Sequence, residues 1–316
     1  MSRRRKGEPV HGVVLLDKPA GLSSNQALQR VRRLYNARKA GHTGTLDPFA
    51  TGLLPICLGE ASKTTAFLLD AVKAYRAEAA LGQSTTTGDL EGEPLEAGPV
   101  PDASRDVVER VMRRFTGDLE QVPPMYSALK HEGKPLYEYA RQGITVPRKA
   151  RAVTIHELRL LDWTPPRLAF EVVCSKGTYV RTLAEDIAQA LGTVGHLVAL
   201  RRLRVGPFRI DGTQAGHGGP VDDAVTLDDL ESAAARGALA AHLLPVDAAL
   251  PDWPVVQLGS EAARAFRHGN PAPLAAEDSP AATGAVRVRD GSGRLLGLGE
   301  NEGGMVRPRR VFQLDG

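Results

Sequence analysis

The chain has 316 residues, 42% hydrophobic and 24% charged, which is enough to bury a sizeable core in one large or two smaller domains. It has no run of about 18 apolar residues, and no apolar segment follows its basic N-terminus, so we expect neither a membrane helix nor a secretory signal. Its two cysteines, Cys57 and Cys174, lie far apart without CxxC spacing, which favours a reducing, cytoplasmic location and no metal site.

The formal net charge is +3, but the charges are unevenly distributed. Residues 1–40 carry ten Lys and Arg against two acidic residues, whereas residues 211–240 carry six acidic residues and one Arg. A basic segment favours a polyanionic partner, and nucleic acid is the usual one. A solvated basic tail at residues 1–9 that binds nothing is the alternative interpretation.

The first predicted elements are a strand and a helix. Residues 13–21, VVLLDKPAG, predict a short buried strand that ends in a Pro-Gly turn. A helix follows, because Ser23 and Gln26 can form a capping box and Gly41 stands where a C-terminal cap is expected. The next elements are a half-buried strand at 73–82, a polar loop at 84–102 and an amphipathic helix at 104–117.

Residues 168–192, LAFEVVCSKGTYVRTLAEDIAQALG, predict a strand followed by a helix. Thr182 and Glu185 would form a second capping box at the start of that helix. Tyr179 and Arg181 would then end the strand two residues apart, so we expect their side chains to share a face.

The last third of the chain changes in composition. Residues 212–245 are Gly-rich, then acidic and Ala-rich, and are interpreted as an insertion or linker. From residue 246 onwards, short apolar runs separated by Gly and Pro predict a small, mostly β domain. Strands alternating with helices before residue 210 indicate an α+β or α/β protein, and the pattern alone does not set the strand order.

The stretch GHTGTLDPFATGLLP, residues 41–55, places three glycines and two prolines around a single aspartate, Asp47. It lacks the lysine of a GxxxxGK[ST] phosphate loop, so nucleoside triphosphate binding is disfavoured. Plain turn scaffolding is one interpretation, because Asp before Pro commonly starts a turn. The other is a loop whose glycines allow a sharp turn that presents one carboxylate.

From about residue 10 to residue 210 the motifs resemble, in order, those of the TruB family of tRNA pseudouridine synthases. The blocks that carry the resemblance are LLDKPAGLSSNQAL (15–28), AGHTGTLDPFATGLLPICLGEASK (40–63), KAYRAEAALGQSTTTGD (73–89), QVPPMYSALKHEGKPLYEYARQG (121–143) and SKGTYVRTLAEDIAQALG (175–192). The resemblance implies an α+β fold with a mixed-sheet catalytic domain at residues 10–211. It also implies a PUA-like RNA-binding domain at 246–316, whereas the segment 212–245 departs from the family pattern.

The reaction implied by the resemblance is the isomerisation of uridine 55 in the T loop of tRNA to pseudouridine. Every atom of the base is retained, so no cofactor, metal or energy source is expected. Asp47 matches the family's nucleophile and Arg181 matches its ion-pair partner. Tyr75 matches the tyrosine that stacks on the base and assists proton removal.

Four further positions match family residues that surround the substrate. His42 matches the histidine that helps to flip the base, and Tyr179 the tyrosine of the same pocket. Leu200 matches an apolar pocket residue, and Lys18 a lysine near the site. Taken singly, each has an ordinary structural interpretation, such as a loop histidine, a core tyrosine or a turn lysine.

The partner implied by the resemblance is the T stem-loop of tRNA, bound by a monomer that needs no membrane and no protein partner. Two alternatives stay open: an RNA-binding or RNA-folding protein with an inactive site, and a guide-dependent relative within a ribonucleoprotein. The presence of Asp47, Tyr75 and Arg181 favours an enzyme over the first. The short basic extension disfavours the second.

Overall fold

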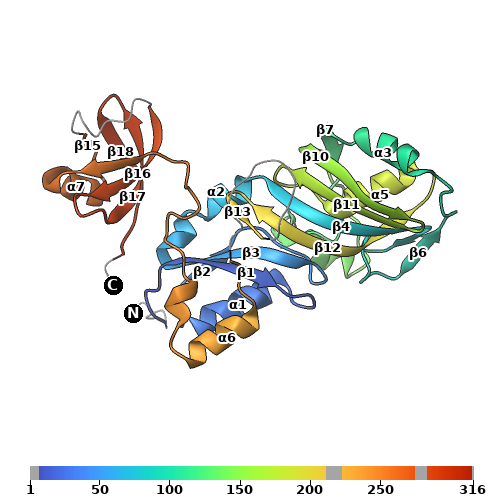
Figure 1. Ribbon diagram of the computed structural model, residues 1–316, viewed down its shortest axis with the longest axis horizontal. Helices are drawn as coiled ribbons and strands as arrows, with labels where there is room; N and C mark the ends of the chain where they lie inside the picture. The colour runs from blue at the N-terminus through green and yellow to red at the C-terminus, as the bar shows by residue number, and fades with distance from the viewer. Residues whose placement is uncertain (1–6, 211–222, 275–282, 315–316) are drawn as a thin grey trace.

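The computed structural model describes residues 7–210, 223–274 and 283–314, and its centre is a nine-stranded sheet. The strands are β1 (Gly12–Lys18), β2 (Ala40–His42), β3 (Thr51–Leu58), β4 (Lys73–Leu81), β7 (Gly117–Gln121), β10 (Arg151–Thr164), β11 (Arg167–Cys174), β12 (Gly195–Val205) and β13 (Phe208–Arg209). Their order is β1-β3-β12-β4-β11-β10-β7, with β2 beside β3 and β13 beside β12 (Figure 1). The β3–β12 pair is parallel and its neighbours are antiparallel, so the expected mixed-sheet α+β class is confirmed.

Helices and two short hairpins surround this sheet. The helices are α1 (Ser24–Leu34), η1 (Gly59–Lys63), α2 (Thr65–Asp70), α3 (Arg105–Arg113), α4 (Leu136–Ala140), α5 (Val180–Ala190), α6 (Leu227–Ala235) and η2 (Leu239–His242). The hairpins are β5 (Gln83–Thr85) with β6 (Pro94–Ala97), and β8 (Lys130–His131) with β9 (Lys134–Pro135). The segment expected to be a loop at 84–102 therefore contains a short hairpin, because its backbone pairs across the turn between β5 and β6.

Strand β1 is buried on both faces. Val14 and Leu16 pack against α1 on one face, whereas Val13 and Leu15 join a second cluster on the other. A strand covered on both sides has no solvent face, which is why its sequence is a continuous apolar run and does not alternate. Strand β1 is thus a fixed support for β3, with which it pairs along its whole length.

Helix α1 begins as predicted and ends earlier than predicted. Ser23 and Gln26 form the capping box at its start. Its last residue is Leu34, and Asn36 follows in the left-handed conformation with φ of 46°. Asparagine adopts this conformation more readily than most residues and can therefore terminate a helix. Gly41, the expected cap, lies in β2.

The start of α5 also differs from the prediction. Strand β11 ends at Cys174, Tyr179 is the N-cap residue of α5, and Arg181 lies in the first turn of the helix. The predicted capping box at Thr182 is wrong, because the helix begins before it. The side-chain oxygen of Gln121, on β7, accepts a hydrogen bond of 3.0 Å from the Tyr179 amide. The side chain of Gln121, 58 residues away in the chain, thus caps the N-terminus of α5 in place of a neighbouring residue.

The segment 212–245 was interpreted as an insertion or linker, and its described part, residues 223–245, is packed against the sheet and is not a linker. Helix α6 lies beside α1 (Figure 1), and its Leu230 is buried in the same cluster as Leu16 of β1. The Tyr35 hydroxyl donates a hydrogen bond of 2.9 Å to the Leu239 carbonyl. The acidic, Ala-rich composition therefore belongs to an amphipathic helix that completes the core. Residues 212–222 of this segment, like residues 1–6 of the basic tail, lie outside the described residues.

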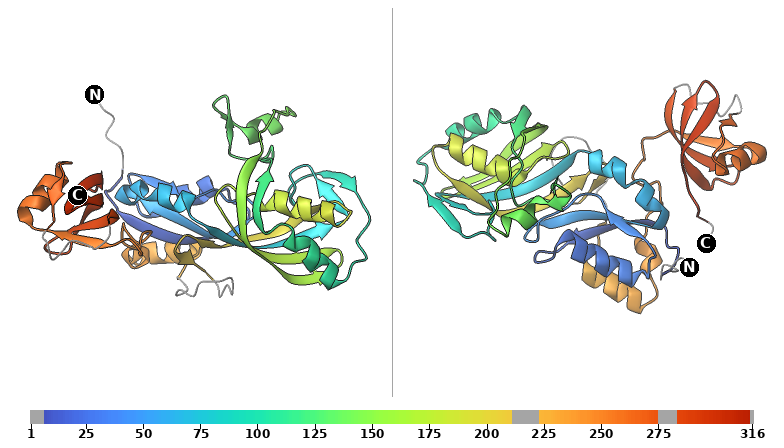
Figure 2. Two further views of the ribbon diagram at one scale, coloured as in Figure 1. Left: turned by 90° about the horizontal axis from the view of Figure 1, so that it is seen from above. Right: turned by 180° about the vertical axis from the view of Figure 1, so that it is seen from behind.

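The C-terminal part forms a separate β domain at one end of the molecule (Figure 2). Its elements are β14 (Val255–Leu258), α7 (Ser260–Arg267), β15 (Ala272–Pro273), β16 (Gly284–Asp290), β17 (Leu295–Glu302) and β18 (Met305–Val311), with sheet order β14-β16-β17-β18-β15. The prediction of a small, mostly β domain is confirmed. The Lys63 ammonium donates a hydrogen bond of 2.7 Å to the Val311 carbonyl, and the rings of Phe67 and Trp253 meet edge to face at 4.9 Å, so this domain contacts the domain of the nine-stranded sheet.

Candidate active site

The loop between β2 and β3 presents Asp47. Gly44 within it has a φ of 122°, a conformation that side chains disfavour. Gly52, at the start of β3, has a φ of 100°, and a Cβ atom there would lie 2.3 Å from the Arg202 carbonyl oxygen. Two of the three glycines in the motif thus serve a sharp turn and the close approach of β3 to β12. Gly41 has no such requirement.

Contacts from several elements hold this loop on both sides of Asp47. The buried Ser24 hydroxyl accepts a hydrogen bond of 2.7 Å from the Leu46 amide and donates one of 3.0 Å to the Leu46 carbonyl. The Pro48 carbonyl accepts a hydrogen bond of 3.2 Å from the Lys18 ammonium. Because the residues before and after Asp47 are anchored, the carboxylate is presented from a fixed backbone.

Asp47 and Arg181 form a two-pronged ion pair. The Arg181 Nε lies 3.0 Å from Asp47 Oδ2, and Nη2 donates to Oδ1 at 3.3 Å. Only 5% of the Arg181 side chain is exposed, against 32% for Asp47. The planar guanidinium therefore fixes the direction of the Asp47 carboxylate, and the carboxylate itself stays partly exposed.

Arg181 is itself held by further acceptors. Its Nη1 donates to the Thr87 carbonyl at 2.6 Å, and its Nη2 donates to the Tyr126 carbonyl at 2.7 Å. The carboxylate of Asp89, of which 5% is exposed, lies 3.5 Å from Nη1. Sequence reasoning missed Asp89, although it ends one of the matching motif blocks.

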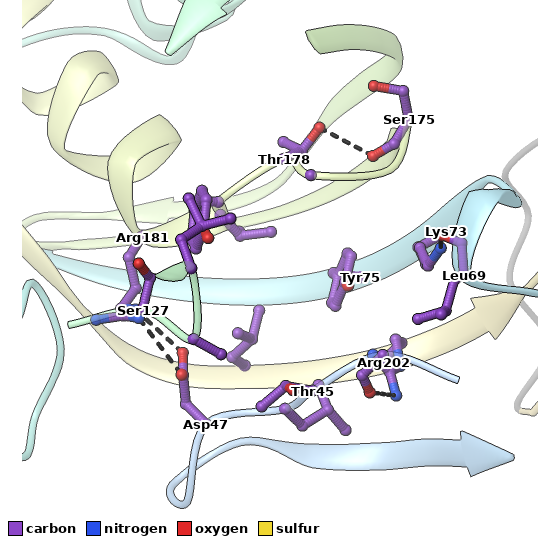
Figure 3. A pocket seen from close by; sticks show the side chains of 18 residues that line it. Thr45, Asp47, Leu69, Lys73, Tyr75, Ser127, Ser175, Thr178, Arg181 and Arg202 are labelled. Atoms are coloured by element: carbon purple, nitrogen blue, oxygen red, sulfur yellow. Dashed lines mark hydrogen bonds and ion pairs between the residues drawn. The ribbon is translucent and has the colours of Figure 1, made fainter. Parts of the chain in front are cut away.

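One cavity beside the pair has a volume of about 380 Å³. Tyr75, Tyr179 and Leu200 line it together with Asp47 and Arg181. Figure 3 shows Tyr75 rising from β4, to the right of the ion pair in that view. The structure thus brings together five of the seven predicted site residues, from a loop, two strands and the start of a helix.

A second cavity, of about 720 Å³, is also lined by Asp47 and Arg181. His42 lines it, and so do Tyr137 and Arg141 from the α4 segment, which stands out from the sheet together with β8 and β9 (Figure 2). The His42 Nδ1 is buried and finds no partner among the described residues.

Lys18 lines neither cavity. It is fully buried, and its ammonium donates to the carbonyls of Pro19 at 2.8 Å and Pro48 at 3.2 Å. Burial lowers the pKa of Lys18 to about 8, and the negative charge of Asp47 opposes this effect. Its contacts are those of a residue that supports the loop.

Burial dominates the electrostatics of the site. It raises the pKa of the Asp47 carboxyl; Arg181 opposes this rise, Asp89 adds to it and Lys18 opposes it. Burial lowers the pKa of His42, and the positive charge of Arg202 lowers it further, so the imidazole is neutral at pH 7. Burial also raises the phenol pKa of Tyr179 and of Tyr75.

Neither a metal site nor a membrane-spanning helix is found among the described residues. No group of three or more His, Cys, Asp or Glu side chains there could hold a metal ion. In the same ranges, no helix is long and apolar enough to cross a membrane.

Solved structures share this fold over most of the chain. A chain in a "Crystal Structure of a Cbf5-Nop10-Gar1 Complex" superposes with a TM-score of 0.69 at 28% identity, covering 96% of this chain and 85% of its own. A chain in a "Structure of H/ACA RNP bound to a substrate RNA containing 2'-deoxyuridine" gives a TM-score of 0.69 at 25% identity, covering 99% and 92%.

Curated relatives and family descriptions match along nearly the full length. A "tRNA pseudouridine synthase B" of Chromohalobacter salexigens is 50% identical over 313 residues, covering 99% of this chain and 97% of its own. One of Pseudomonas aeruginosa is 49% identical over 314 residues, covering 98% of both. The family descriptions matched are "TruB family pseudouridylate synthase (N terminal domain)" at 32–180, "tRNA pseudouridylate synthase B C-terminal domain" at 181–251 and "Pseudouridine synthase II TruB, C-terminal" at 254–312. The chain belongs to the TruB family of pseudouridine synthases, as its motifs predicted.

Proposed function

We propose that this chain isomerises uridine 55 in the T loop of tRNA to pseudouridine, with Asp47 as the nucleophile. The observation that carries the proposal is the partly exposed Asp47 carboxylate at a cavity, held by two contacts from the buried guanidinium of Arg181. The curated relatives, described as tRNA pseudouridine synthase B, support the substrate.

Asp47 supplies the electron pair that the reaction needs. Isomerisation breaks the bond between ribose and N1, turns the uracil, and joins C5 to the ribose. A carboxylate opens this path by forming a transient bond to the nucleoside, and it does so only when ionised. Arg181 opposes the rise in the Asp47 pKa that burial causes, which favours the ionised form, and it directs the carboxylate toward the cavity.

Tyr75 stacks on the uracil and accepts the proton that leaves C5. Tyr179 and Leu200 form further walls of the same cavity. Extruding a base from its stack costs a few kcal/mol, and stacking on an aromatic ring returns about 1–3 kcal/mol per base. His42, in the neighbouring cavity, assists this extrusion as a neutral imidazole.

The remaining RNA meets basic side chains and the C-terminal domain. Arg30 and Arg33 are exposed on α1, which begins beside the larger cavity through Ser24 and Asn25. Residues 246–316 act as an RNA-holding domain, set apart from the catalytic loop. We propose that the protein acts as a stand-alone monomer. It needs no cofactor, because the reaction conserves every atom of the base.

The test is incubation of the purified protein with an unmodified tRNA transcript in EDTA, followed by mapping of pseudouridine. We expect one pseudouridine, at position 55, and none in a transcript that carries cytidine there. A T-arm hairpin should react, whereas an unstructured strand with the same loop sequence should react far more slowly, because RNA-binding proteins read a loop together with its adjoining stem. Absence of pseudouridine in the intact transcript would refute the proposal. Equal reaction of hairpin and unstructured strand would refute recognition by shape.

A further inference from the structure

Arg202 is a buried cation whose side chain donates hydrogen bonds to backbone carbonyls. It lies on β12, and only 1% of the residue is exposed. Its Nε donates to the Leu53 carbonyl at 2.7 Å, and its Nη2 donates to the Gly44 carbonyl at 3.1 Å. In the described part of the chain, no Asp or Glu forms an ion pair with it. The two carbonyls hold the guanidinium in place and leave its charge unneutralised, which is a costly arrangement in a protein interior.

This charge faces the same cavity as Tyr75. Arg202 and Tyr75 are register partners on the adjacent antiparallel strands β12 and β4. Both side chains line the cavity of about 380 Å³, and Figure 3 shows them on the same side of the Asp47–Arg181 pair. The charge of Arg181 is neutralised by the carboxylates of Asp47 and Asp89, whereas the charge of Arg202 can stabilise an anion that forms during the reaction.

We propose that Arg202 is a positioning residue for Tyr75, whose phenolate form it stabilises through its unneutralised positive charge. The inference rests on the proposed function, in which Tyr75 accepts the C5 proton. In that step the phenolate oxygen takes the proton. The electron pair of the C–H bond forms the C5–C6 double bond, and the π pair of the N1–C6 bond moves to N1. N1 takes up a proton from water, and the Tyr75 phenol then returns its proton to the hydroxide that is left.

The other groups around Tyr75 cannot replace this effect. Burial raises the pKa of the Tyr75 phenol, the positive charge of Arg202 lowers it, and Cys174 and Asp47 raise it. Lys73 also lines the cavity, but its ammonium donates to the carbonyls of Leu68, Leu69 and Ala71 at 3.0, 2.6 and 2.7 Å. Arg202 is thus the neighbour that favours the phenolate.

The direct test is a titration that does not require activity. 3-Fluorotyrosine is placed at position 75, and its ionisation is followed by ¹⁹F NMR in full-length protein with Arg202, Arg202→Lys, Arg202→Gln or Arg202→Met. Loss of a nearby opposite charge should raise the phenol pKa by about one unit or more in the Gln and Met variants. The Lys variant should lie closer to the wild type, because it keeps the charge. Arg201→Met is the matched control, since Arg201 on the same strand pairs with Asp17 at 2.7 Å and does not line the cavity.

The second readout is the single-turnover rate with and without the tyrosine hydroxyl. We expect Arg202→Gln to lower the rate about 10²-fold, which is the usual contribution of a positioned proton acceptor, and to change tRNA affinity less than threefold. In a Tyr75→Phe background the same substitution should change the residual rate less than threefold. An unchanged phenol titration in folded Arg202→Gln, or an equal rate loss in both backgrounds, would overturn the proposal. A wild-type rate for Tyr75→Phe would refute the role of Tyr75 in the proposed function, while the titration would still report whether Arg202 acts on the phenol.

Discussion

Replacing Arg181 with lysine should be a severe change, although it conserves the charge. The guanidinium reaches both oxygens of Asp47, two backbone carbonyls and the Asp89 carboxylate within 3.5 Å. An ammonium is a single point with three donors, so it cannot span both Asp47 oxygens and still reach the carbonyls. The carboxylate would lose its fixed direction.

The magnitude follows from the bonds that are lost. A hydrogen bond to a charged group contributes about 1.5–3 kcal/mol. Losing one of the two bonds to Asp47, with some misplacement of the nucleophile, raises the barrier by about 3 kcal/mol, which corresponds to a rate about 10²-fold lower. Arg181→Met should be slower still, because it leaves Asp47 and the buried Asp89 without their shared cation.

The assay is the single-turnover rate of pseudouridine formation as a function of pH for wild type, Arg181→Lys and Arg181→Met. Thermal melts serve as the control, because breaking a buried ion pair costs about 3–5 kcal/mol of stability, and the partial exposure of Asp47 reduces that cost. If folded Arg181→Met reacts at the wild-type rate near pH 7, Arg181 does not control the nucleophile and the reasoning fails.

Three further predictions concern the proposed nucleophile, Asp47, and the binding of RNA. Asp47→Asn should abolish turnover while keeping tRNA affinity within about tenfold, because the amide keeps the shape and loses the nucleophilic charge; turnover by contamination-free Asp47→Asn would exclude the mechanism. Burial raises the pKa of Asp47, so the wild-type rate should fall as pH drops through that raised value, and the fall should begin at higher pH in Arg181→Met, which lacks the opposing cation; coincident profiles would contradict this assignment. Replacing the exposed Arg30 and Arg33 with alanine should weaken tRNA binding and reduce the slope of log K against log salt by about one to two, since each phosphate contact contributes slightly less than one; an unchanged slope in a binding titration would show that α1 does not meet phosphate.

The sequence alone determined the features that depend on near neighbours in the chain. The capping box of Ser23 and Gln26 and the half-buried strand β4 are set by residues within a few positions of one another, and both were predicted. The family motifs likewise predicted Asp47, Tyr75 and Arg181 as site residues, and all three line one cavity. Local pattern failed where the partner is distant: Gln121 of β7 caps α5 from 58 residues away, and α6 completes a core begun by β1.

Only the tertiary structure decided how the site is supported. The contact between Arg181 and Asp47 joins residues 134 apart, and the two carbonyls that hold Arg202 are 149 and 158 residues from it. Nothing in the periodicity around Arg202 distinguishes it from Arg201, yet one is buried at the cavity and the other pairs with Asp17. The reason is physical: local sequence sets which backbone conformation a segment prefers, whereas burial and charge compensation arise only when distant strands pair and bring their side chains to one face.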